Sequence, residues 1–293
     1  MMKEPKLSTP VPVERAEFGI GVGDSVMLIG SCFTENMGGR FAELGFPTRV
    51  NPFGILYNPL SMAVALSYCM DNRRVEEESL VFHDGLWHSW LHHGTFSRHD
   101  KRECLEACNQ AVDDAHEFLH TCKTLIVTFG SAWYYTLKRN GSVVANCHKV
   151  PAVQFDKRIA TVDEAVSAWT PLLKRLSELG IRVVFTVSPV RHGAYGAHGN
   201  QLGKAVLLLA IEEMMRSEST VTAPWLSYFP AYEIVMDELR DYRFYTDDLL
   251  HPSSLAERII WQRFQQTYMN DETIKFCEEK ENLNKRMAHR ELH

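Results

Sequence analysis

The chain has 293 residues, of which 45% are hydrophobic, a composition typical of globular proteins with a large core. Its 31 basic and 37 acidic side chains give a formal net charge of −6. This balance provides no strong cationic field to hold a phosphate backbone, so nucleic acid is excluded as an expected partner.

The sequence also bears on location. No apolar run reaches the roughly eighteen residues that cross a membrane, and residues 1–20 lack the apolar segment of a signal peptide. The seven cysteines are an odd number at unrelated spacings, which indicates reduced thiols rather than a disulfide framework. We therefore expect a soluble, cytoplasmic protein without a membrane partner.

A Gly-Asp-Ser triplet at residues 23–25 resembles the sequence that carries the nucleophile in one large class of serine esterases. Ser25, however, opens an apolar run at residues 25–30 that reads as the first strand. At about 3.3 Å per residue, Ser25 would lie about 16 Å from the carboxyl end of that strand. We interpret the triplet as a turn that leads into the strand.

The first predicted strand ends at Gly30 and is followed at once by a helical pattern. Ser31 would therefore stand at the carboxyl end of the strand, where α/β proteins place their chemistry. Serine is also a common helix cap, so this spacing alone leaves both roles open. Cys32 is an alternative nucleophile. Adjacent residues at a helix start point in different directions, however, and we expect Cys32 to pack as a buried thiol.

Apolar runs and helical patterns alternate along the chain. Further strands are predicted at residues 47–50, 124–130, 181–190 and 224–230. Helices are predicted at residues 34–45, 59–70, 103–122, 161–180, 202–218 and 253–269. This alternation predicts an α/β fold with a mostly parallel sheet and right-handed crossovers.

Two segments interrupt the alternation and are predicted to be β-hairpins that overhang the active edge of the sheet. Residues 79–96 contain an Asp84-Gly85 turn, and residues 133–150 contain an Asn140-Gly141 turn. The first hairpin is rich in histidine, but no cysteine or carboxylate stands at a metal-ligand spacing, so we expect no metal site there. The histidines concerned are His83, His88, His92 and His93.

Four residues are candidates for substrate binding because they follow strands or lie on a hairpin beside the expected crevice. They are Trp133, His148, Arg191 and His192. Trp133 could form a flat wall for a sugar, although core packing is the commoner role of such a ring. The charged candidates could equally be ordinary surface residues.

Asp248 and His251 stand three residues apart, beyond the last predicted strand. A nucleophilic serine needs a base to take its proton and a carboxylate to orient that base. Asp and His at this spacing can touch, so one short loop can deliver both groups. The following helix is expected to begin with a capping box of Ser254 and Glu257.

The chain is predicted to fold as a single domain over residues 1–270, followed by a charged helical tail over residues 271–293. The tail is rich in Glu and Lys and is expected to be solvated.

Six motifs resemble those of the GSCFA-domain family, a branch of the SGNH (GDSL-like) hydrolase superfamily. They are "GSCF" at 30–33, "NPFG" at 51–54, "YNPLS" at 57–61, "NCHKVP" at 146–151, "TVSPVRH" at 186–192 and "LLHPS" at 249–253. The resemblance implies a three-layer α/β/α SGNH-hydrolase-like fold with inserted β-hairpins. It also implies that Ser31 is the nucleophile, His251 the base and Asp248 its orienting carboxylate.

In such enzymes the oxyanion donors are the N–H of the nucleophile, a glycine N–H after the second strand and an asparagine amide after the third. Ser31 and Gly54 match the first two donors. The asparagine is missing, because residues 130–133 read Gly-Ser-Ala-Trp where the superfamily has Gly-x-Asn-Asp. Candidate replacements, each of which could equally be a turn or capping residue, are Asn58 first, then Asn146 and Ser131.

These residues favour a serine esterase that removes a small acyl group through an acyl-enzyme. By analogy with the superfamily, the expected substrate is an O-acetyl ester of a carbohydrate. A catalytically silent carbohydrate-binding protein on the same fold is the alternative, supported by the missing asparagine. An acetyltransferase is a further alternative. No metal or organic cofactor is expected.

Overall fold

A five-stranded parallel sheet forms the centre of the computed structural model, which describes residues 8–216 and 224–291. The chain leaves β1 toward β2 at one edge and later places β5 on the other side of β1. The carboxyl ends of β1 and β5 therefore form a topological switch point, the usual ligand crevice of such sheets. The predicted parallel sheet is confirmed. Its strands, in the order β10–β9–β5–β1–β2, are β1 (Val26–Gly30), β2 (Thr48–Val50), β5 (Thr124–Phe129), β9 (Arg182–Val187) and β10 (Leu226–Phe229).

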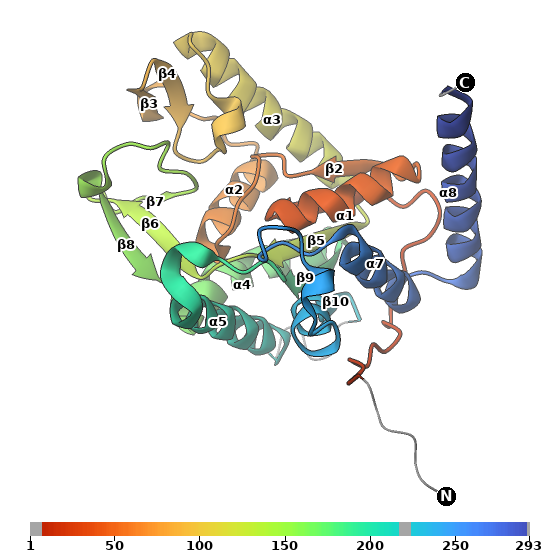
Figure 1. Ribbon diagram of the computed structural model, residues 1–293. Helices are drawn as coiled ribbons and strands as arrows, with labels where there is room; N and C mark the ends of the chain where they lie inside the picture. Colours follow the sequence, from red (N-terminus) through yellow and green to blue (C-terminus); the bar gives the residue numbers. More distant parts are fainter. Residues whose placement is uncertain (1–7, 217–223, 292–293) are drawn as a thin grey trace, which may run out of the picture.

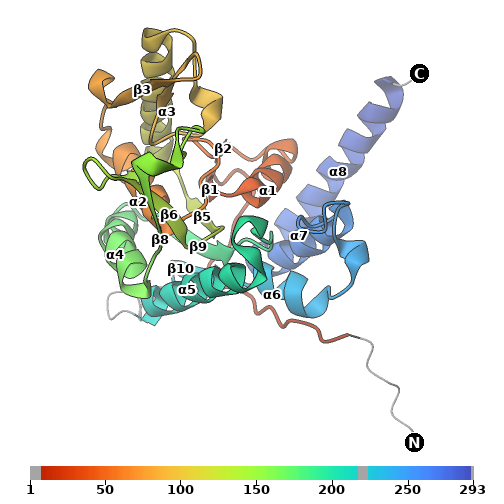
Figure 2. The same ribbon diagram turned by 60° about the vertical axis from the view of Figure 1, so that its left-hand side comes forward.

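Helices cover both faces of this sheet, so the three-layer α/β/α architecture is confirmed (Figures 1 and 2). One layer contains α2 (Pro59–Asp71), α3 (Lys101–Thr121), α4 (Val162–Glu178) and α5 (Gly196–Arg216). The opposite layer contains α1 (Cys32–Glu43), α7 (Ser254–Tyr268), α6 (Ala231–Glu233) and a π-helical turn at Ile234–Glu238. The predicted end of the fifth helix, at residue 218, lies outside the described residues.

Side-chain alternation along the strands explains why both faces are covered. In β1, Met27 and Ile29 join the core beneath α2–α5, whereas Val26 and Leu28 join the core beneath α1 and α7. A strand that is apolar on both faces is typical of a buried parallel sheet.

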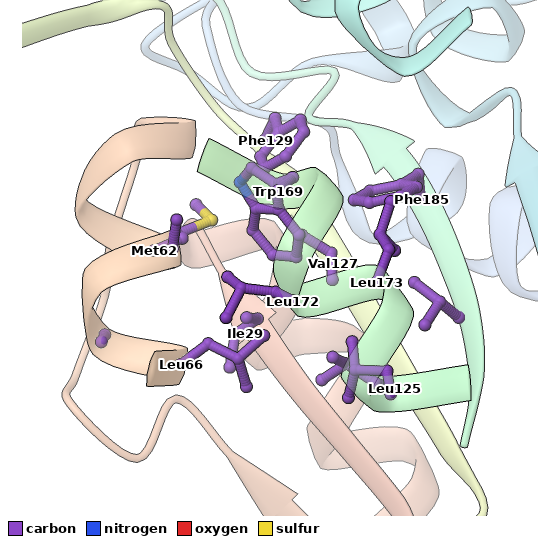
Figure 3. Close-up of a cluster of buried hydrophobic side chains, with 14 of the residues drawn as sticks. Ile29, Met62, Leu66, Leu125, Val127, Phe129, Trp169, Leu172, Leu173 and Phe185 are labelled. Atoms are coloured by element: carbon purple, nitrogen blue, oxygen red, sulfur yellow. The ribbon is translucent and has the colours of Figure 1, made fainter. Parts of the chain in front are cut away.

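Figure 3 shows the first of these cores, where Met62 and Leu66 of α2 lie beside α4. The buried Trp169 of α4 packs edge-on against Phe129 and Phe185, with 5.3 Å between ring centroids in each pair. Truncating a buried aromatic residue of this kind typically costs about 3–5 kcal/mol. This contact therefore anchors α4 to the carboxyl halves of two central strands.

Two small antiparallel sheets lie on the side of the domain that carries α2 and α3 (Figures 1 and 2). The first is the predicted hairpin of β3 (Leu80–His83) and β4 (Leu86–Ser89), whose turn residues Asp84 and Gly85 both have positive φ. The second contains the predicted hairpin of β6 (Trp133–Leu137) and β7 (Val143–Val144). A third strand that the sequence did not reveal, β8 (Phe155–Ile159), pairs with β6.

The C-terminal helix α8 (Asp271–Glu291) leaves most of its described side chains at the surface, as expected of the tail, but its first turns pack against the domain. Thr273 and Cys277 are buried, and Phe276 packs edge-on against Phe46. Asn284 donates to the carbonyl of Glu43 at 2.9 Å, which ties α8 to the end of α1. The first turns of α8 thus complete the core beside α7.

None of the helices in the described segments combines the length and apolar character needed to span a bilayer.

Candidate active site

Ser31 lies at the switch point, directly after β1 and before α1. Gly30 makes this sharp turn possible, since a Cβ there would lie 2.5 Å from both the carbonyl oxygen of Thr128 and the hydroxyl of Thr34. Ser31 occupies the N-cap position of α1, yet its side chain makes no capping hydrogen bond. Its hydroxyl is therefore not used by the helix.

The Ser31 hydroxyl faces the neighbouring strand ends. Ser31 is only 2% exposed, and its Oγ donates to the Oγ of Ser188, the residue after β9, at 3.1 Å. Gly130, the residue after β5, lies on another side, where a Cβ would approach the Ser31 Cβ to 3.4 Å. The carboxyl ends of β1, β5 and β9 therefore converge on this serine.

A buried lysine that sequence reasoning missed lies behind these loops. Lys204 of α5 is 2% exposed, and its Nζ donates to the carbonyls of Gly130 at 2.7 Å and Ser188 at 2.6 Å. Burial lowers the pKa of Lys204 to about 7. The helical pattern at 202–218 predicted the helix but gave no sign that this lysine faces inward.

The loop before α7 brings Asp248 and His251 together as predicted. His251 Nδ1 lies 2.5 Å from Asp248 Oδ2. The backbone N–H of His251, then that of Leu250, the Thr246 hydroxyl and the His251 ring hold the pKa of Asp248 well below its ordinary value. The carboxylate is thus ionised and fixes the imidazole with Nδ1 toward Asp248, which leaves Nε2 as the atom that can accept a proton.

The Asp248–His251 loop is bonded to the segment that follows β9. Arg191 N donates to the carbonyl of Leu250 at 3.3 Å, which joins this loop to the segment that begins at Ser188. The His251 side chain is 46% exposed and makes no hydrogen bond to Ser31 within the described part of the chain. Catalytic hydrogen bonds are often long before substrate binds, so this geometry is compatible with a serine–histidine pair.

The helix that follows corrects one detail of the sequence reading. Ser253, not Ser254, caps α7, and its Oγ accepts from Ala256 N at 3.4 Å. Glu257 instead accepts from Asn36 of α1. The expected capping box is therefore absent, and Glu257 links α7 to the helix that begins at Ser31.

Of the two predicted backbone oxyanion donors, one has a free N–H and the other does not. The backbone N–H of Ser31 makes no hydrogen bond to any residue that the structure describes, so it can donate to a ligand. Gly54, in contrast, donates its N–H to the Asn51 carbonyl at 2.7 Å and lies against the side chain of His93. This corrects the prediction for Gly54, whose N–H is already engaged within its own turn.

Among the candidates for the third donor, Asn58 keeps a free amide. Its Oδ1 caps α2 by accepting from Ser61 N at 2.8 Å, while its Nδ2 bonds to no described residue. Asn146 and Ser131 are engaged locally: Asn146 Oδ1 accepts from His148 N, and Ser131 Oγ accepts from Trp133 N. Asn58 therefore remains the side-chain candidate.

The surroundings of the two alternative nucleophiles, Cys32 and Ser25, do not favour a catalytic role. Burial raises the pKa of the Cys32 thiol, which disfavours the thiolate that a cysteine nucleophile requires. Ser25 donates its hydroxyl to the carbonyl of Thr121 at the opposite end of β1. Asp24 of the same triplet pairs with Arg182 at 2.9 Å.

An aromatic wall joins two of the predicted substrate-binding residues to the site. Trp133 stacks on Tyr195 with 4.7 Å between ring centroids, and Tyr195 lies 4.8 Å from His192. Tyr57, which was not predicted, lies 6.2 Å from His192 and packs beside Gly130. We define Tyr57, Trp133, His192 and Tyr195 as the aromatic wall.

Arg191 lines a groove of about 470 Å³ on the flank of the Asp248–His251 loop. Arg240, Tyr242 and Leu249 also line this groove, which we call the arginine groove. Neither Arg191 nor Arg240 forms an ion pair with a carboxylate in the described segments. Two guanidinium groups without a carboxylate partner give the groove, which Asp241 also lines, an excess of positive charge that favours an anion.

His148 is placed in the packing of the hairpins, which corrects its expected role at the site. Its ring is buried, stacks on His88 with 4.4 Å between centroids, and bonds through Nε2 to the Ser89 carbonyl. His92 is also enclosed, with Nδ1 on the Ser89 hydroxyl and its ring stacked on Phe53. Within the described residues, no group of three or more His, Cys, Asp or Glu side chains is arranged to hold a metal ion.

These two histidines predict a pH dependence of stability. Burial, the largest cause for each, lowers the pKa of His92 to about 3 and that of His148 to about 4. Between about pH 6.5 and 4 the unfolded chain therefore binds more protons than the folded one, so the free energy of unfolding falls as the pH falls, by about 1 kcal/mol per pH unit for each histidine. Urea denaturation at pH 7 and pH 5 measures this slope.

His92→Phe should flatten that slope, because it keeps the ring stacked on Phe53 and removes one titrating group. His198→Gln, at an exposed histidine on α5 that makes no hydrogen bond or ring contact with the described residues, is the matched control for loss of a histidine. A His92→Phe protein with the slope of the parent would contradict the prediction.

The fold and these contacts define a three-layer α/β/α protein with a buried serine at its switch point and an Asp–His pair on a loop that bonds to the segment after β9. The sequence model of the GSCFA family matches residues 25–264, and the chain belongs to that family. The resemblance inferred from the six motifs is thereby confirmed.

Two solved structures have a similar arrangement of their chains. One is a candidate acylhydrolase from Bacteroides fragilis NCTC 9343, at 10% identity over 86% of this chain and 89% of that chain, with a TM-score of 0.42. The other is a carbohydrate esterase family 3 protein from Talaromyces cellulolyticus, at 9% identity over 87% and 99% of the two chains, with a TM-score of 0.37. A comparison with curated protein sequences found no match to this chain.

Proposed function

We propose that the chain is a serine esterase in which Ser31 is the nucleophile, His251 the general base and Asp248 its orienting carboxylate. The observation that carries this proposal is the Asp248–His251 contact of 2.5 Å on a loop docked beside the segment that bonds Ser31. An imidazole held on an ionised carboxylate, on a loop bonded to the segment that contacts a buried and uncapped serine, is the arrangement that nucleophilic catalysis requires.

The reaction proceeds through an acyl-enzyme. Ser31 Oγ attacks the ester carbonyl carbon while its proton passes to His251 Nε2, and the carbonyl oxygen becomes an oxyanion that accepts from the Ser31 N–H. The tetrahedral intermediate collapses as the C–O bond to the alcohol breaks, and the imidazolium returns its proton to the departing alcohol oxygen. Water then attacks the acyl carbonyl carbon while its proton passes to His251 Nε2. The bond between the acyl carbon and Ser31 Oγ breaks, and the imidazolium returns the proton to Oγ, which releases the acid and restores Ser31.

The surroundings of Ser31 favour a small acyl group on a carbohydrate. A serine that is 2% exposed and closed in by Gly130 and Ser188 leaves little room for a long acyl chain. The aromatic wall offers flat rings on which a sugar can stack. We therefore propose an O-acetyl ester of a saccharide as the substrate class.

Hydrolysis of 4-nitrophenyl acetate, butyrate and octanoate, together with acetate release from an acetylated saccharide, tests this function. The acetyl esters should turn over fastest. Acetate that appears on an added sugar rather than in solution would identify an acetyltransferase. No turnover of any ester, combined with binding of the deacetylated saccharide, would favour the catalytically silent carbohydrate-binding protein.

The arginine groove lies where the alcohol portion of the ester is expected, because His251 must reach the departing alcohol oxygen. Arg191→Gln should therefore raise KM about tenfold for an ester whose alcohol carries a carboxylate, with kcat nearly unchanged, since one charge-assisted hydrogen bond is worth about 1.5 kcal/mol. Steady-state kinetics on acidic and neutral saccharide esters measure the difference. Arg102→Gln, at an exposed ion pair on α3, is the charge-matched control. Equal KM values for parent and Arg191→Gln would remove the groove from the substrate site.

A further inference from the structure

Lys204 is a basic side chain enclosed in the protein, and its Nζ contacts backbone carbonyls. Its two hydrogen bonds go to neutral backbone carbonyls, and no described carboxylate lies within ion-pair distance of its Nζ. Dehydrating an unpaired ammonium is costly, and an apolar side chain of the same length would fill the space without that cost. A buried titratable group retained at such expense is a candidate for a functional role.

The two carbonyls that Lys204 binds belong to the residues on either side of the nucleophile. Gly130 packs directly against Ser31, and Ser188 receives the Ser31 hydrogen bond. Ser188 Oγ also accepts from Val190 N at 3.4 Å, so the Ser188 loop is held both by its own turn and by the ammonium. Lys204 thus fixes the two walls between which Ser31 Oγ lies.

Among the residues that the structure describes, no anion near Lys204 cancels the charge of its ammonium form. The titratable groups that face it are Cys32 from α1, His192 from the loop after β9 and Tyr232 from α6, whose ring centroid is 5.6 Å from Nζ. Burial raises the pKa of Cys32 and of Tyr232 and lowers that of His192, which keeps all three uncharged. In a dry interior such a charge acts over a longer range than it would in water.

We propose, on the basis of the esterase function above, that Lys204 is a positioning residue for the chemistry at Ser31. Its ammonium holds the Gly130 and Ser188 loops around the nucleophile. It also supplies the positive potential that an asparagine at position 132 would otherwise give to the oxyanion. Because Nζ is enclosed, Lys204 acts through this framework and its field and does not touch the substrate.

Lys204→Met tests the proposal, because it keeps the length of the side chain and removes the charge. We expect kcat to fall about 10²–10³-fold, as for loss of an oxyanion donor, while KM changes less than about threefold. The urea midpoint should change little, since the variant loses a buried charge along with two hydrogen bonds. Lys174→Met, at an exposed lysine of α4, is the matched control and should retain the parent kcat.

The pH profile gives a readout that a purely structural role would not move. The ammonium is charged below its pKa and neutral above it, so the kcat of the parent should decline as the pH rises through that value. Lys204→Met should show no such alkaline decline. If the variant does not fold, the profile of the parent alone decides, and a flat alkaline side overturns the proposal.

A folded Lys204→Met protein with the kcat and alkaline profile of the parent would also overturn it. These outcomes differ from failure of the esterase function itself, in which the parent would turn over no ester and an active-site serine probe would leave Ser31 unlabelled.

Discussion

Ser31→Ala is expected to abolish ester turnover while the fold survives. Without Oγ no acyl-enzyme can form, and loss of a catalytic serine typically lowers kcat by about 10⁴-fold or more. The substitution also removes the hydrogen bond to Ser188, which is worth about 1 kcal/mol and should lower the melting temperature by only a few degrees. Steady-state hydrolysis of 4-nitrophenyl acetate and thermal unfolding measure the two effects.

Ser25→Ala is the matched control for this experiment. Ser25 belongs to the Gly-Asp-Ser triplet but donates to the Thr121 carbonyl at the amino end of β1. Its replacement should therefore leave kcat at the parent value. Activity that survives in Ser31→Ala and disappears in Ser25→Ala would identify Ser25, at the amino end of β1, as the nucleophile and would contradict the assignment of Ser31.

His251→Ala should have an effect of similar size. The imidazole both takes the serine proton and returns it to the departing alcohol, so we expect kcat to fall about 10⁴–10⁶-fold with little change in KM. Asp248→Asn should cost about 10⁴-fold, because an amide no longer favours the tautomer that leaves Nε2 free. Both variants are measured with the same ester and compared at one pH.

Asp247→Asn is the matched control for the carboxylate. Asp247 is the exposed neighbour of Asp248 and makes no hydrogen bond to His251 within the described residues. The backbone N–H of His251 and the other contacts hold the pKa of Asp248 well below its ordinary value, so its carboxylate stays ionised as the pH falls through the mildly acidic range. Equal activities of Asp247→Asn and Asp248→Asn would contradict an orienting role for Asp248.

Local sequence was sufficient to predict the parts of the site that are built by neighbouring residues. The apolar run before Gly30 predicts a strand, and the sharp turn then places Ser31 at its carboxyl end. Asp248 and His251 are three residues apart, so their contact needs no long-range information. Alternation of strands and helices likewise predicts the layers, because each element must bury one side against the sheet.

The remainder depends on contacts between distant segments. Lys204 reads as one polar position in a helical pattern, and only the packing of α5 against the turn after β5 turns it inward. Ser188 lies in the TVSPVRH motif, but its hydrogen bond joins it to Ser31, 157 residues away in the sequence, and the motif does not reveal that partner. Gly54 was predicted to be an oxyanion donor from the family resemblance, but its N–H donates to the Asn51 carbonyl in a local turn that the motif does not specify.

Labelling with a fluorophosphonate probe, followed by mass spectrometry to locate the modified residue, tests whether Ser31 is an activated nucleophile. We expect Ser31 of the folded protein to be labelled and the label to be lost in His251→Ala, because the probe reacts with a serine that has a base beside it. Modification of Cys32 or Ser25 in place of Ser31, or equal labelling of Ser31 with and without His251, would contradict this role of Ser31.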